Sequence, residues 1–437
     1  MLSKEAVKQV FEKTKSMVSH YATFRFYGTD NSTTRFANSE INQNIAIKSS
    51  TLVITVYDGK KSASCSTNVL SDDGIKQMVE SAEELLKYVP DGEFPAFPFS
   101  TDEIPTHEDD GKLAGKFDSY TCANILKEGL GYVEKDYTAA GALNVDRMVF
   151  SLGDSEGAFR YTSSATVKFN TVVTHISGAA GGDECISYTK APDILNCFKK
   201  AQSTAKAARD TVEPELGGHT VVLSPIAFAD LISFACYPLN AKSVEDGGSY
   251  AVGKLGEKVF GDNLTIKDVP GHKELLPYAF DEDGNKREQV TLIEKGVVKS
   301  FLYDNVMAAK HNVKSTGHSV GNGYGGYAFH VVVDGGEKSL EEIIAGIEKG
   351  IFINEFHYTN FVNARNLQIT GLTRNGTFLI ENGKLTKPIS TVRFTESLLD
   401  AFNNITELTK EQTLVAGSTA SLVPGVRIEN FHFTSKS

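Results

Sequence analysis

A five-residue motif in the last third of the chain has the spacing of a nucleophilic serine. Gly317-His-Ser-Val-Gly321 matches the Gly-x-Ser-x-Gly pattern, and Asp334 and His357 follow it in the order of the Ser, Asp and His of α/β-hydrolases. The pattern serves catalysis where a strand runs into a helix at the serine, but residues 310–315 and 322–327 predict neither element. We therefore expect a glycine-rich loop, and a hydrolase that uses Ser319 stays as an alternative.

The same stretch, residues 317–327, is rich in glycine and tyrosine, and we call it the Gly/Tyr loop. Long loops of this kind in a protein with more than one domain often line a binding groove. Its side chains Tyr324 and Tyr327 are therefore candidates for contact with a peptide substrate. The alternative is an ordinary surface loop.

Four histidines in this region raise the possibility of a metal site: His311, His318, His330 and His357. No two of them stand four residues apart on one predicted helix, and no carboxylate accompanies them at a ligand spacing. Single histidines are more often surface or hydrogen-bonded residues. We predict no metal site in this chain.

Residues 281–284, Asp-Glu-Asp-Gly, have part of the pattern of an EF-hand calcium loop. The sixth position and the final glutamate of that loop are out of place here. We predict a hairpin turn instead.

Cys236 is the candidate for a thiol nucleophile, which is a second non-metal alternative. A catalytic cysteine needs a neighbouring base that lowers its pKa. Its neighbours Phe234 and Tyr237 are aromatic, so we favour a buried structural cysteine.

The segment Asp246-Gly-Gly-Ser-Tyr-Ala-Val-Gly-Lys-Leu-Gly-Glu-Lys-Val-Phe260 is another glycine-rich stretch. It lacks the Gly-Lys-Ser/Thr order that places a lysine on phosphates. Turns that need positive φ or a close backbone approach explain its glycines. Glu257 is the ionisable residue there that we would test as a substrate-binding side chain.

Composition limits the class of protein. The 437 residues are enough for two or three domains, and 41% hydrophobic and 23% charged residues are ordinary for a soluble globular protein. A net charge of -11 without a basic stripe argues against nucleic-acid binding. Five cysteines without a C-x-x-C pair fit a reduced cytoplasm. No signal core or long apolar run is present, so we expect no membrane span.

The periodicity of apolar residues predicts an N-terminal α+β domain, with helices on an antiparallel sheet. The expected elements are helices over residues 4–20, 74–88, 119–138 and 192–210, a strand over 23–27, a turn within 30–43 that feeds a strand beginning near Ile41, a hairpin at Asp58-Gly59, and strands over 144–152, 157–169 and 171–177. Four prolines between residues 89 and 110 predict an extended connector.

We predict a domain boundary at residue 213, with an N-terminal domain over 1–212 and a C-terminal domain over 213–437. Ser224-Pro225 predicts the start of a helix that ends before Pro238. The rest of the C-terminal half predicts mostly antiparallel β-structure, closed or barrel-like, with hairpins at Lys295-Gly296 and Asn382-Gly383 and a helix over 340–351.

Several of these segments resemble the TldD/PmbA family. The resemblance is specific from Gly248 onward and weaker before Asp210. It lies in the Gly-Ser pair and Gly-Lys-Leu-Gly-Glu turn of residues 246–260, the strand over 263–268, the Thr-Arg-Phe-Ala-Asn core at 34–38, Leu379-Ile-Glu-Asn-Gly-Lys-Leu385 and the ending over 422–433. The two-subunit form of that family is a zinc metallopeptidase, and PmbA-type proteins have also been called modulators of DNA gyrase. The negative net charge gives the gyrase label no electrostatic support.

The resemblance implies the subunit without metal. Catalytic subunits of the family carry His-Glu-x-x-x-His on a helix just upstream of the glycine-rich segment, where residues 228–239 of this chain contain neither His nor Glu. Ile232, Ser233 and Cys236 or Tyr237 stand where the motif would fall. A late cysteine ligand of the family is also missing, because Cys236 is the last cysteine. Zinc hydrolysis needs three protein ligands and a water.

We therefore expect a PmbA/TldE-like subunit that carries no catalytic or metal residue of its own. It would pair with a zinc-bearing TldD-like chain, or with itself, and help to enclose peptides or unfolded proteins. The alternatives are a homodimeric peptide-binding protein without proteolysis and a hydrolase that uses Ser319 or Cys236.

Overall fold

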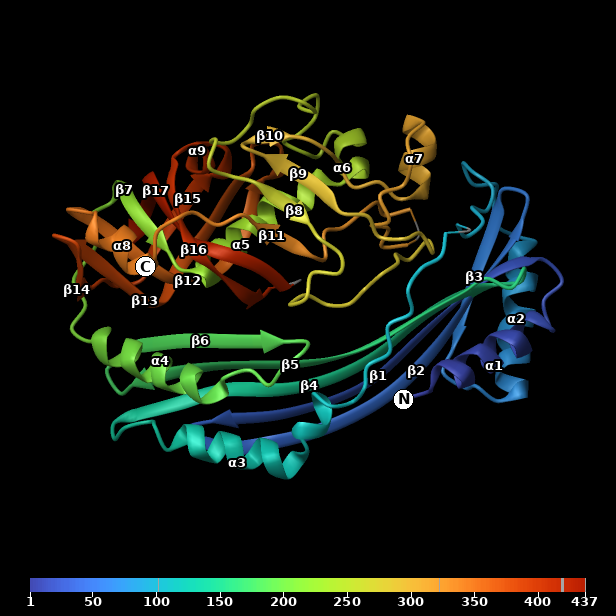
Figure 1. Cartoon of the computed structure of the whole chain (residues 1–437), viewed down its shortest axis with the longest axis horizontal. Helices are drawn as coiled ribbons and strands as arrows, with labels where there is room; N and C mark the ends of the chain where they lie inside the picture. Colours follow the sequence, from blue (N-terminus) through green and yellow to red (C-terminus); the bar gives the residue numbers. More distant parts are fainter. Residues whose placement is uncertain (101, 322, 418–419, 437) are drawn as a thin grey trace.

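Two β-sheets organise the chain (Figure 1). The computed structural model describes residues 1–100, 102–321, 323–417 and 420–436. In these residues the first sheet has six strands in the order β3-β2-β1-β4-β5-β6, and the second has eleven. We call them the N-terminal sheet and the C-terminal sheet. Together with the helices they confirm the predicted α+β class.

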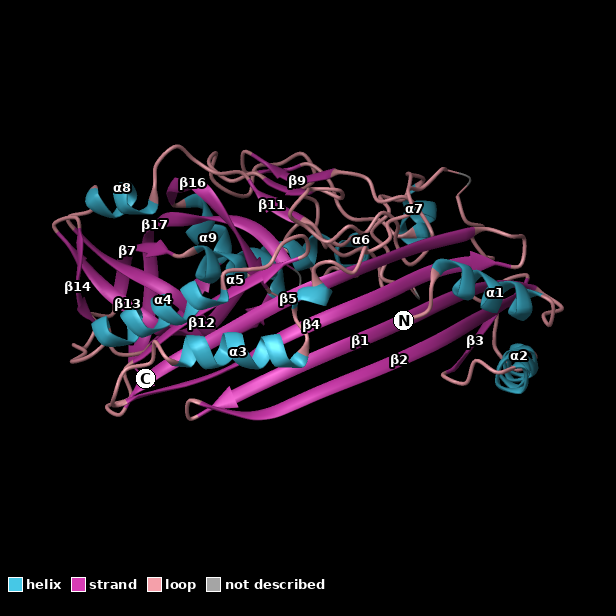
Figure 2. Ribbon diagram, turned by 60° about the horizontal axis from the view of Figure 1, so that its bottom comes forward, coloured by secondary structure: helices cyan, strands magenta, loops and turns pink. Residues whose placement is uncertain are grey.

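The N-terminal sheet consists of β1 (Tyr21–Ala37), β2 (Glu40–Asp58), β3 (Lys61–Thr67), β4 (Tyr137–Asp154), β5 (Phe159–His175) and β6 (Ala180–Ser187). All its neighbouring strands pair antiparallel. Figure 2 shows β1, β2, β4 and β5 lying side by side as long strands, with α3 near one end and α1 and α2 near the other. The hairpin predicted at Asp58-Gly59 is confirmed.

The turn expected within residues 30–43 is shorter than predicted, because β1 continues to Ala37 and reverses only at Asn38 and Ser39, both with positive φ. The strand expected to begin near Ile41 is confirmed as β2, which begins at Glu40. Asp30, one of the residues that suggested a longer turn, pairs with Lys48 of β2 at 3.4 Å, and hydroxyl groups also bond across the strands. Thr29 Oγ1 lies 2.7 Å from Ser49 Oγ, and Thr33 Oγ1 donates to Asn144 Oδ1 at 2.8 Å. Cross-strand hydroxyl pairs of this kind stabilise an extended backbone.

The outer half of β2 extends past its neighbour. β3 pairs with Leu52–Asp58 only, so no other strand of the described chain covers the second edge of residues 40–51. Ile41, Ile45 and Ile47 in this segment are 39%, 40% and 59% exposed. This stretch is an open apolar strand edge.

Four helices cover the ends and one face of the N-terminal sheet: α1 (Lys4–Lys15), α2 (Asp72–Leu86), α3 (Ser119–Leu130) and α4 (Ile194–Ala207). They bury two apolar clusters, one around Phe11 and Phe24 and one around Phe169 and Phe198. α1, α3 and α4 are shorter than predicted, and α2 has the predicted length but begins two residues earlier. Ser71 caps α2 by accepting from Gly74 N. None of the described helices is both long enough and apolar enough to cross a membrane.

The C-terminal sheet closes on itself. Its strands are β7 (Gly217–Leu223), β8 (Ile266–Asp268), β9 (Val290–Glu294), β10 (Val297–Val298), β11 (Val331–Val333), β12 (Lys349–Asn363), β13 (Gln368–Glu381), β14 (Lys384–Pro388), β15 (Val392–Ser397), β16 (Ile405–Ala416) and β17 (Ala420–Lys436). β7 pairs with both β12 and β17, so β7, β12, β13, β15 and β17 form a closed circuit. Most of its pairings are antiparallel, which confirms the predicted closed, mostly antiparallel arrangement.

The described residues of the C-terminal half form five α-helices: α5 (Pro225–Cys236), α6 (Ala241–Glu245), α7 (Asn305–His311), α8 (Leu340–Ala345) and α9 (Leu398–Asn403). Ser224 caps α5 and Pro225 is at its first position, as predicted. The helix predicted over 340–351 ends at Ala345, because the chain turns there into β12. α5 packs against β12 and β17, and Phe228, Leu231 and Ile232 in it are fully buried.

An aromatic joint connects the two sheets. The Phe150 ring of β4 lies 5.3 Å from the rings of Tyr278 and Phe280, which precede β9 in the C-terminal half. Tyr27 OH donates to Glu282 Oε2 at 2.8 Å beside it. The predicted connector over residues 89–110 forms no helix or strand where the structure describes it. The domain division at residue 213 stays a prediction.

Replacement of Phe150 by alanine removes the centre of this joint. We expect a loss of about 3–5 kcal/mol in the free energy of unfolding, the usual cost of truncating a buried phenylalanine, because the side chain is 1% exposed. Chemical denaturation measures the change. The control Tyr120→Ala removes a ring that is 77% exposed and should cost at most about 0.5 kcal/mol. Equal effects of the two substitutions would contradict the role of the joint.

Candidate functional site

The inner end of α5 faces a very small cavity. Ile232, Ser233 and Cys236 of α5 line it together with Tyr237, which follows the helix, opposite Tyr327 of the Gly/Tyr loop, with Ala328, Val331 and Ser421 completing the wall. The cavity volume is about 10 Å³, which is room for about one water molecule. Ile232, Ser233, Cys236 and Tyr237 are the residues that stand where the zinc motif would fall, and α5 carries no histidine or glutamate. We call this place the α5 pocket.

Cys236 is buried in the wall of the α5 pocket, with 6% exposure. Burial, together with the nearby Asp268 carboxylate, raises the pKa of its thiol to about 12. The thiol therefore stays protonated at neutral pH, and a protonated thiol is a poor nucleophile. This environment is that of a structural cysteine.

A row of aromatic rings runs from the α5 pocket to the surface. Tyr237 lies 6.1 Å from Tyr327 and 6.4 Å from Phe361, and Tyr327 lies 5.2 Å from Phe329. Tyr237 is 55% exposed and Tyr324, farther along the Gly/Tyr loop, is 71% exposed. We call Phe361, Tyr237, Tyr327 and Phe329 the aromatic row. Large rings that are partly exposed beside a pocket offer contact area to a ligand at low entropic cost.

Two histidines hold the region of the Gly/Tyr loop against one buried carboxylate. His318 Nε2 lies 3.1 Å from Asp268 Oδ1, and His330 Nδ1 lies 3.4 Å from the same oxygen. The three side chains have no exposed surface. The backbone N–H of His330 donates to Asp268 Oδ2 at 2.9 Å. Because His318 lies at the start of the loop and His330 just after its end, Asp268 fixes both ends.

The tautomers of the two rings follow from their carbonyl partners. His318 Nδ1 lies 2.8 Å from Thr316 O, and His330 Nε2 lies 2.9 Å from Leu276 O. A carbonyl only accepts, so these nitrogens carry hydrogen. The nitrogen that faces Asp268 then carries a proton only when its ring is an imidazolium. Burial alone would raise the pKa of Asp268, but the two imidazoles hold it well below its usual range, so the carboxylate is ionised.

Ser319 lies in a loop and not in a catalytic triad. Its hydroxyl accepts from Gly321 N at 3.0 Å, its own N–H donates to Asp281, and the residue is 1% exposed. Asp334 pairs with Lys267 at 2.7 Å, and His357 is exposed on β12. No hydrogen bond among the described residues joins these three side chains, and neither a strand nor a helix adjoins the serine.

The remaining predicted residues lie apart from the α5 pocket. Glu257 forms an exposed ion pair with Lys254 at 2.9 Å, and His311 pairs with Glu245 at 2.8 Å. Asp281 accepts from Asn285 N in a tight turn, as predicted for residues 281–284. No group of three or more His, Cys, Asp and Glu side chains in the described ranges could hold a metal ion.

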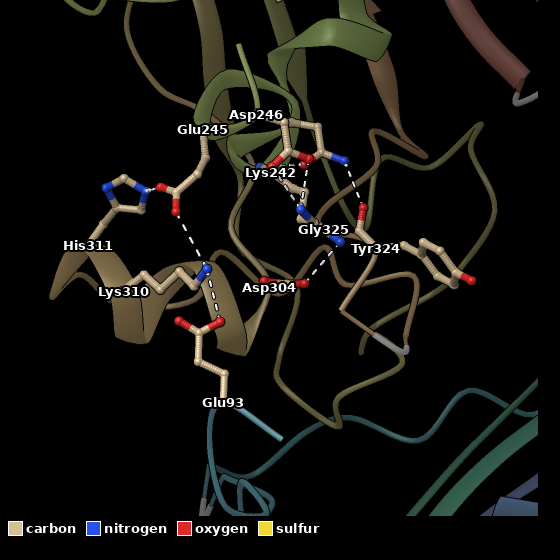
Figure 3. A network of polar contacts seen from close by, with 10 residues as sticks. Glu93, Lys242, Glu245, Asp246, Asp304, Lys310, His311, Tyr324 and Gly325 are labelled. Atoms are coloured by element: carbon tan, nitrogen blue, oxygen red, sulfur yellow. Dashed lines mark hydrogen bonds and ion pairs between the residues drawn. The ribbon is translucent and has the colours of Figure 1, made fainter. Parts of the chain in front are cut away.

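A polar network fixes the outer side of the Gly/Tyr loop (Figure 3). Asp304 caps α7 and also accepts from Gly325 N at 2.9 Å. Lys310 of α7 pairs with Glu245 of α6 at 3.5 Å and with Glu93 of the connector at 3.0 Å. The Tyr324 side chain points away from these contacts in Figure 3. The network thus holds the backbone of the loop and leaves this ring exposed.

The role of Asp268 was missed from the sequence, where it marked only the end of a strand. The signal available was weak: an aspartate at the end of β8 and two histidines, twelve residues apart, on either side of the Gly/Tyr loop. Nothing in the linear spacing says that all three side chains meet in the interior. The pairing of β8 with β11 brings them together.

Substitution Asp268→Asn tests this anchor. Removing one partner of a buried charge pair costs about 3–5 kcal/mol, so we expect a loss of that size in the free energy of unfolding and faster proteolysis within residues 317–330. The carboxylate stabilises the fold above the unfolded pKa of aspartate, and this contribution is lost only as the pH falls through its lowered folded pKa.

The control for this experiment is Asp334→Asn on the neighbouring strand end. Asp334 is in an ion pair with Lys267 and its side chain is 46% exposed, so its loss should cost about 0.2–1 kcal/mol. Chemical denaturation and mass mapping of the cut sites measure both effects. An Asp268→Asn variant as stable and as protease-resistant as the control would contradict the anchor.

Most of the chain matches models of two domains of one protein family. Residues 217–435 match the PmbA/TldA metallopeptidase C-terminal domain, and residues 22–86 match the PmbA/TldA metallopeptidase domain 1. The metalloprotease PmbA of Escherichia coli O157:H7 is 23% identical over 380 residues, which are 81% of this chain and 79% of the relative. Two other curated relatives are matched over only 45% and 66% of their own length.

Solved structures share the fold. TldE from Thermococcus kodakarensis superposes with a TM-score of 0.87 at 20% identity, over 98% of this chain and 100% of that one. A Thermotoga maritima protein, described as a suggested modulator of a DNA gyrase, superposes with a TM-score of 0.83 at 19% identity, over 98% and 99% of the two chains. With the C-terminal family model covering residues 217–435, the chain belongs to the PmbA/TldD family of metallopeptidases.

Proposed function

We propose that this chain is the PmbA/TldE-like subunit of a TldD/PmbA-type metallopeptidase system, and that it holds no zinc itself. The observation that carries the proposal is the α5 pocket. Ile232 has no ligand atom, and Cys236 is held as a neutral thiol. A catalytic zinc site needs three converging donors and an open position for a water, and a pocket of about 10 Å³ does not have room for a metal ion and a water together.

The catalytic metal would then come from a TldD-like partner. Zinc in such a partner supplies a bound water for attack on the peptide carbonyl. The residues of this chain would contribute by holding the substrate. The aromatic row and Tyr324 are the candidates, because they expose rings next to the α5 pocket. Peptides and unfolded proteins are the substrate class, since extended chains present backbone and side chains to such a surface.

A homodimeric binding protein without proteolysis is the second candidate. The same exposed rings favour it, because they can bind a peptide whether or not a zinc subunit is present. A TldD-like chain encoded beside this one would favour the first candidate, and a genome without such a chain would favour the second. In either case we place the chain in the cytoplasm, where its five free cysteines would stay reduced.

Metal content and peptidase activity test the main proposal together. The purified chain should contain no stoichiometric zinc and should leave casein intact, because the α5 pocket has no ligand set. Addition of a purified TldD-like chain should produce cleavage that a chelator abolishes. Metal analysis and gel electrophoresis of casein measure the two results. Stoichiometric zinc in the lone chain, or casein cleavage by it, would overturn the proposal.

Substitution Tyr327→Ala tests the aromatic row. With the partner present we expect the KM for a peptide to rise several-fold while kcat changes little, because the ring would contact the substrate and not the reacting atoms. Steady-state kinetics on a fluorogenic peptide measure both constants. Tyr120→Ala, which removes an exposed ring elsewhere, is the control. Unchanged KM and kcat for Tyr327→Ala would contradict a role of the aromatic row in substrate binding.

A further inference from the structure

A second, larger cavity lies where the two halves of the chain meet. Its volume is about 430 Å³, within the range of small-molecule sites, and we call it the junction cavity. Its floor is the outward face of β1, β2 and β3, including Thr23, Thr55 and Ser64. Its roof is the proline-rich connector around Phe97, and Asp283 forms one wall. None of these residues belongs to the α5 pocket.

The roof is fixed on both sides. Gly92 N donates to Lys60 O at 2.8 Å, next to the β2–β3 turn, and Glu93 pairs with Lys310 at 3.0 Å (Figure 3). At the far end Arg160 donates to Ser100 O at 2.6 Å. These hydrogen bonds and the ion pair therefore hold the connector in place over the cavity. It places the aromatic side chains Phe94, Phe97 and Phe99 in the lining of the cavity.

The charges around Asp283 do not balance. Four carboxylates interact there, those of Asp281, Glu282, Asp283 and Asp304, against two guanidinium groups, Arg25 and Arg287. If all are ionised, two negative charges remain in excess. Arg25 does not supply a free cation, because it lies 3.5 Å from Glu282 Oε2 and donates to Glu282 O.

Arg287 does not line the junction cavity. It lies between the rings of Tyr278 and Phe329 at 4.9 and 4.7 Å. Burial, with Asp304 beside it, raises the pKa of Asp283. Arg25 also lines the junction cavity, and its charge acts against the rise in the pKa of Asp283. The excess of carboxylates over cations around Asp283 is therefore the feature that favours a bound cation.

An independent feature points to a missing partner. Thr23 lines the junction cavity and is 4% exposed, and its Oγ1 has no hydrogen-bond partner in the described part of the chain. A buried hydroxyl without a partner is unusual, because it forfeits its hydrogen bond to water. A donor that enters the cavity would satisfy it.

We propose that the junction cavity binds an organic cation, a primary ammonium on a flexible apolar chain. Asp283 would pair with the ammonium, the Thr23 and Thr55 hydroxyls would accept its remaining hydrogens, and the roof phenylalanines would cover the apolar chain and face the charge. A metal ion is a poor occupant, since no group of three His, Cys, Asp and Glu side chains in the described residues could hold one. A lysine side chain of a peptide and a free diamine share this chemistry.

That the bound ammonium belongs to a lysine side chain of a peptide rests on the proposed function, whereas the existence of the cation site does not. If the ligand is a lysine side chain, the cavity gives the system a preference for basic peptides. If it is a free diamine, the site is independent of proteolysis. Binding is therefore measured on the lone chain, without a partner, so that failure of the peptidase proposal and failure of the cation site are separate results.

The experiment is titration calorimetry on the full chain with three probes. They are a blocked pentapeptide with a central lysine, the same peptide with that lysine acetylated, and 1,5-diaminopentane. We expect the lysine peptide or the diamine to bind at least tenfold more tightly than the acetylated peptide. The affinity should fall on acidification, because Asp283 must be ionised to bind the cation. This loss should occur at a higher pH than it would for an ordinary aspartate, because the pKa of Asp283 is raised.

Two variants and a control place the binding site. Asp283→Asn should weaken binding of the cation at least tenfold, and Phe97→Leu, which keeps apolar volume but removes the ring, should weaken it about threefold. Asp262→Asn changes an aspartate whose side chain is 79% exposed and should change nothing. If Asp283→Asn does not fold, binding of the lysine peptide to Phe97→Leu and binding of the acetylated peptide to the unmodified chain still test the site. Equal binding of acetylated and free lysine, no binding of any cation, or an unaffected Phe97→Leu variant would overturn the site.

Discussion

A carboxylate that is removed from water needs a compensating charge, and in this chain that requirement falls on Asp268. The side chain has no exposed surface and lies between His318 and His330. The two imidazoles come from opposite ends of the Gly/Tyr loop, so their contact with Asp268 also fixes both ends of that loop. The loop in turn carries Tyr327 into the α5 pocket. The geometry of the pocket thus depends on an ion cluster that lies outside it.

The α5 pocket shows how side chains can fill the space at the C-terminal end of a helix in this family fold. Zinc ligands on a helix leave polar atoms that need a metal or hydrogen-bond partners. Ile232 and Cys236 bury their surface in the main apolar core of the C-terminal half instead. A site filled by side chains stabilises the fold directly by removing apolar surface from water. The helix packs against β12 and β17 of the closed circuit of five strands.

The sequence predicted the elements whose signals are local. Ser224-Pro225 gave the start of α5, Asp58-Gly59 gave a hairpin, and four prolines gave the extended connector. It failed where long-range pairing overrode local preference. Residues 30–37 look like a turn, but β2 and β4 on either side supply hydroxyl and charge partners that keep them extended. The Asp268 cluster and the junction cavity could not be predicted, because each joins residues from distant parts of the chain. Only tertiary pairing places them together.

The unpaired outer edge of β2 has a consequence for how the protein behaves at high concentration. Open edges with apolar side chains are templates for strand addition, and natural proteins protect them with charge. Here Glu40 and Lys48 are the charges at the two ends of the exposed isoleucine segment. Two copies that meet edge to edge would extend the N-terminal sheet into a continuous one. The solubility of the chain therefore depends on whether repulsion between these few charges outweighs strand pairing through the open backbone groups of β2.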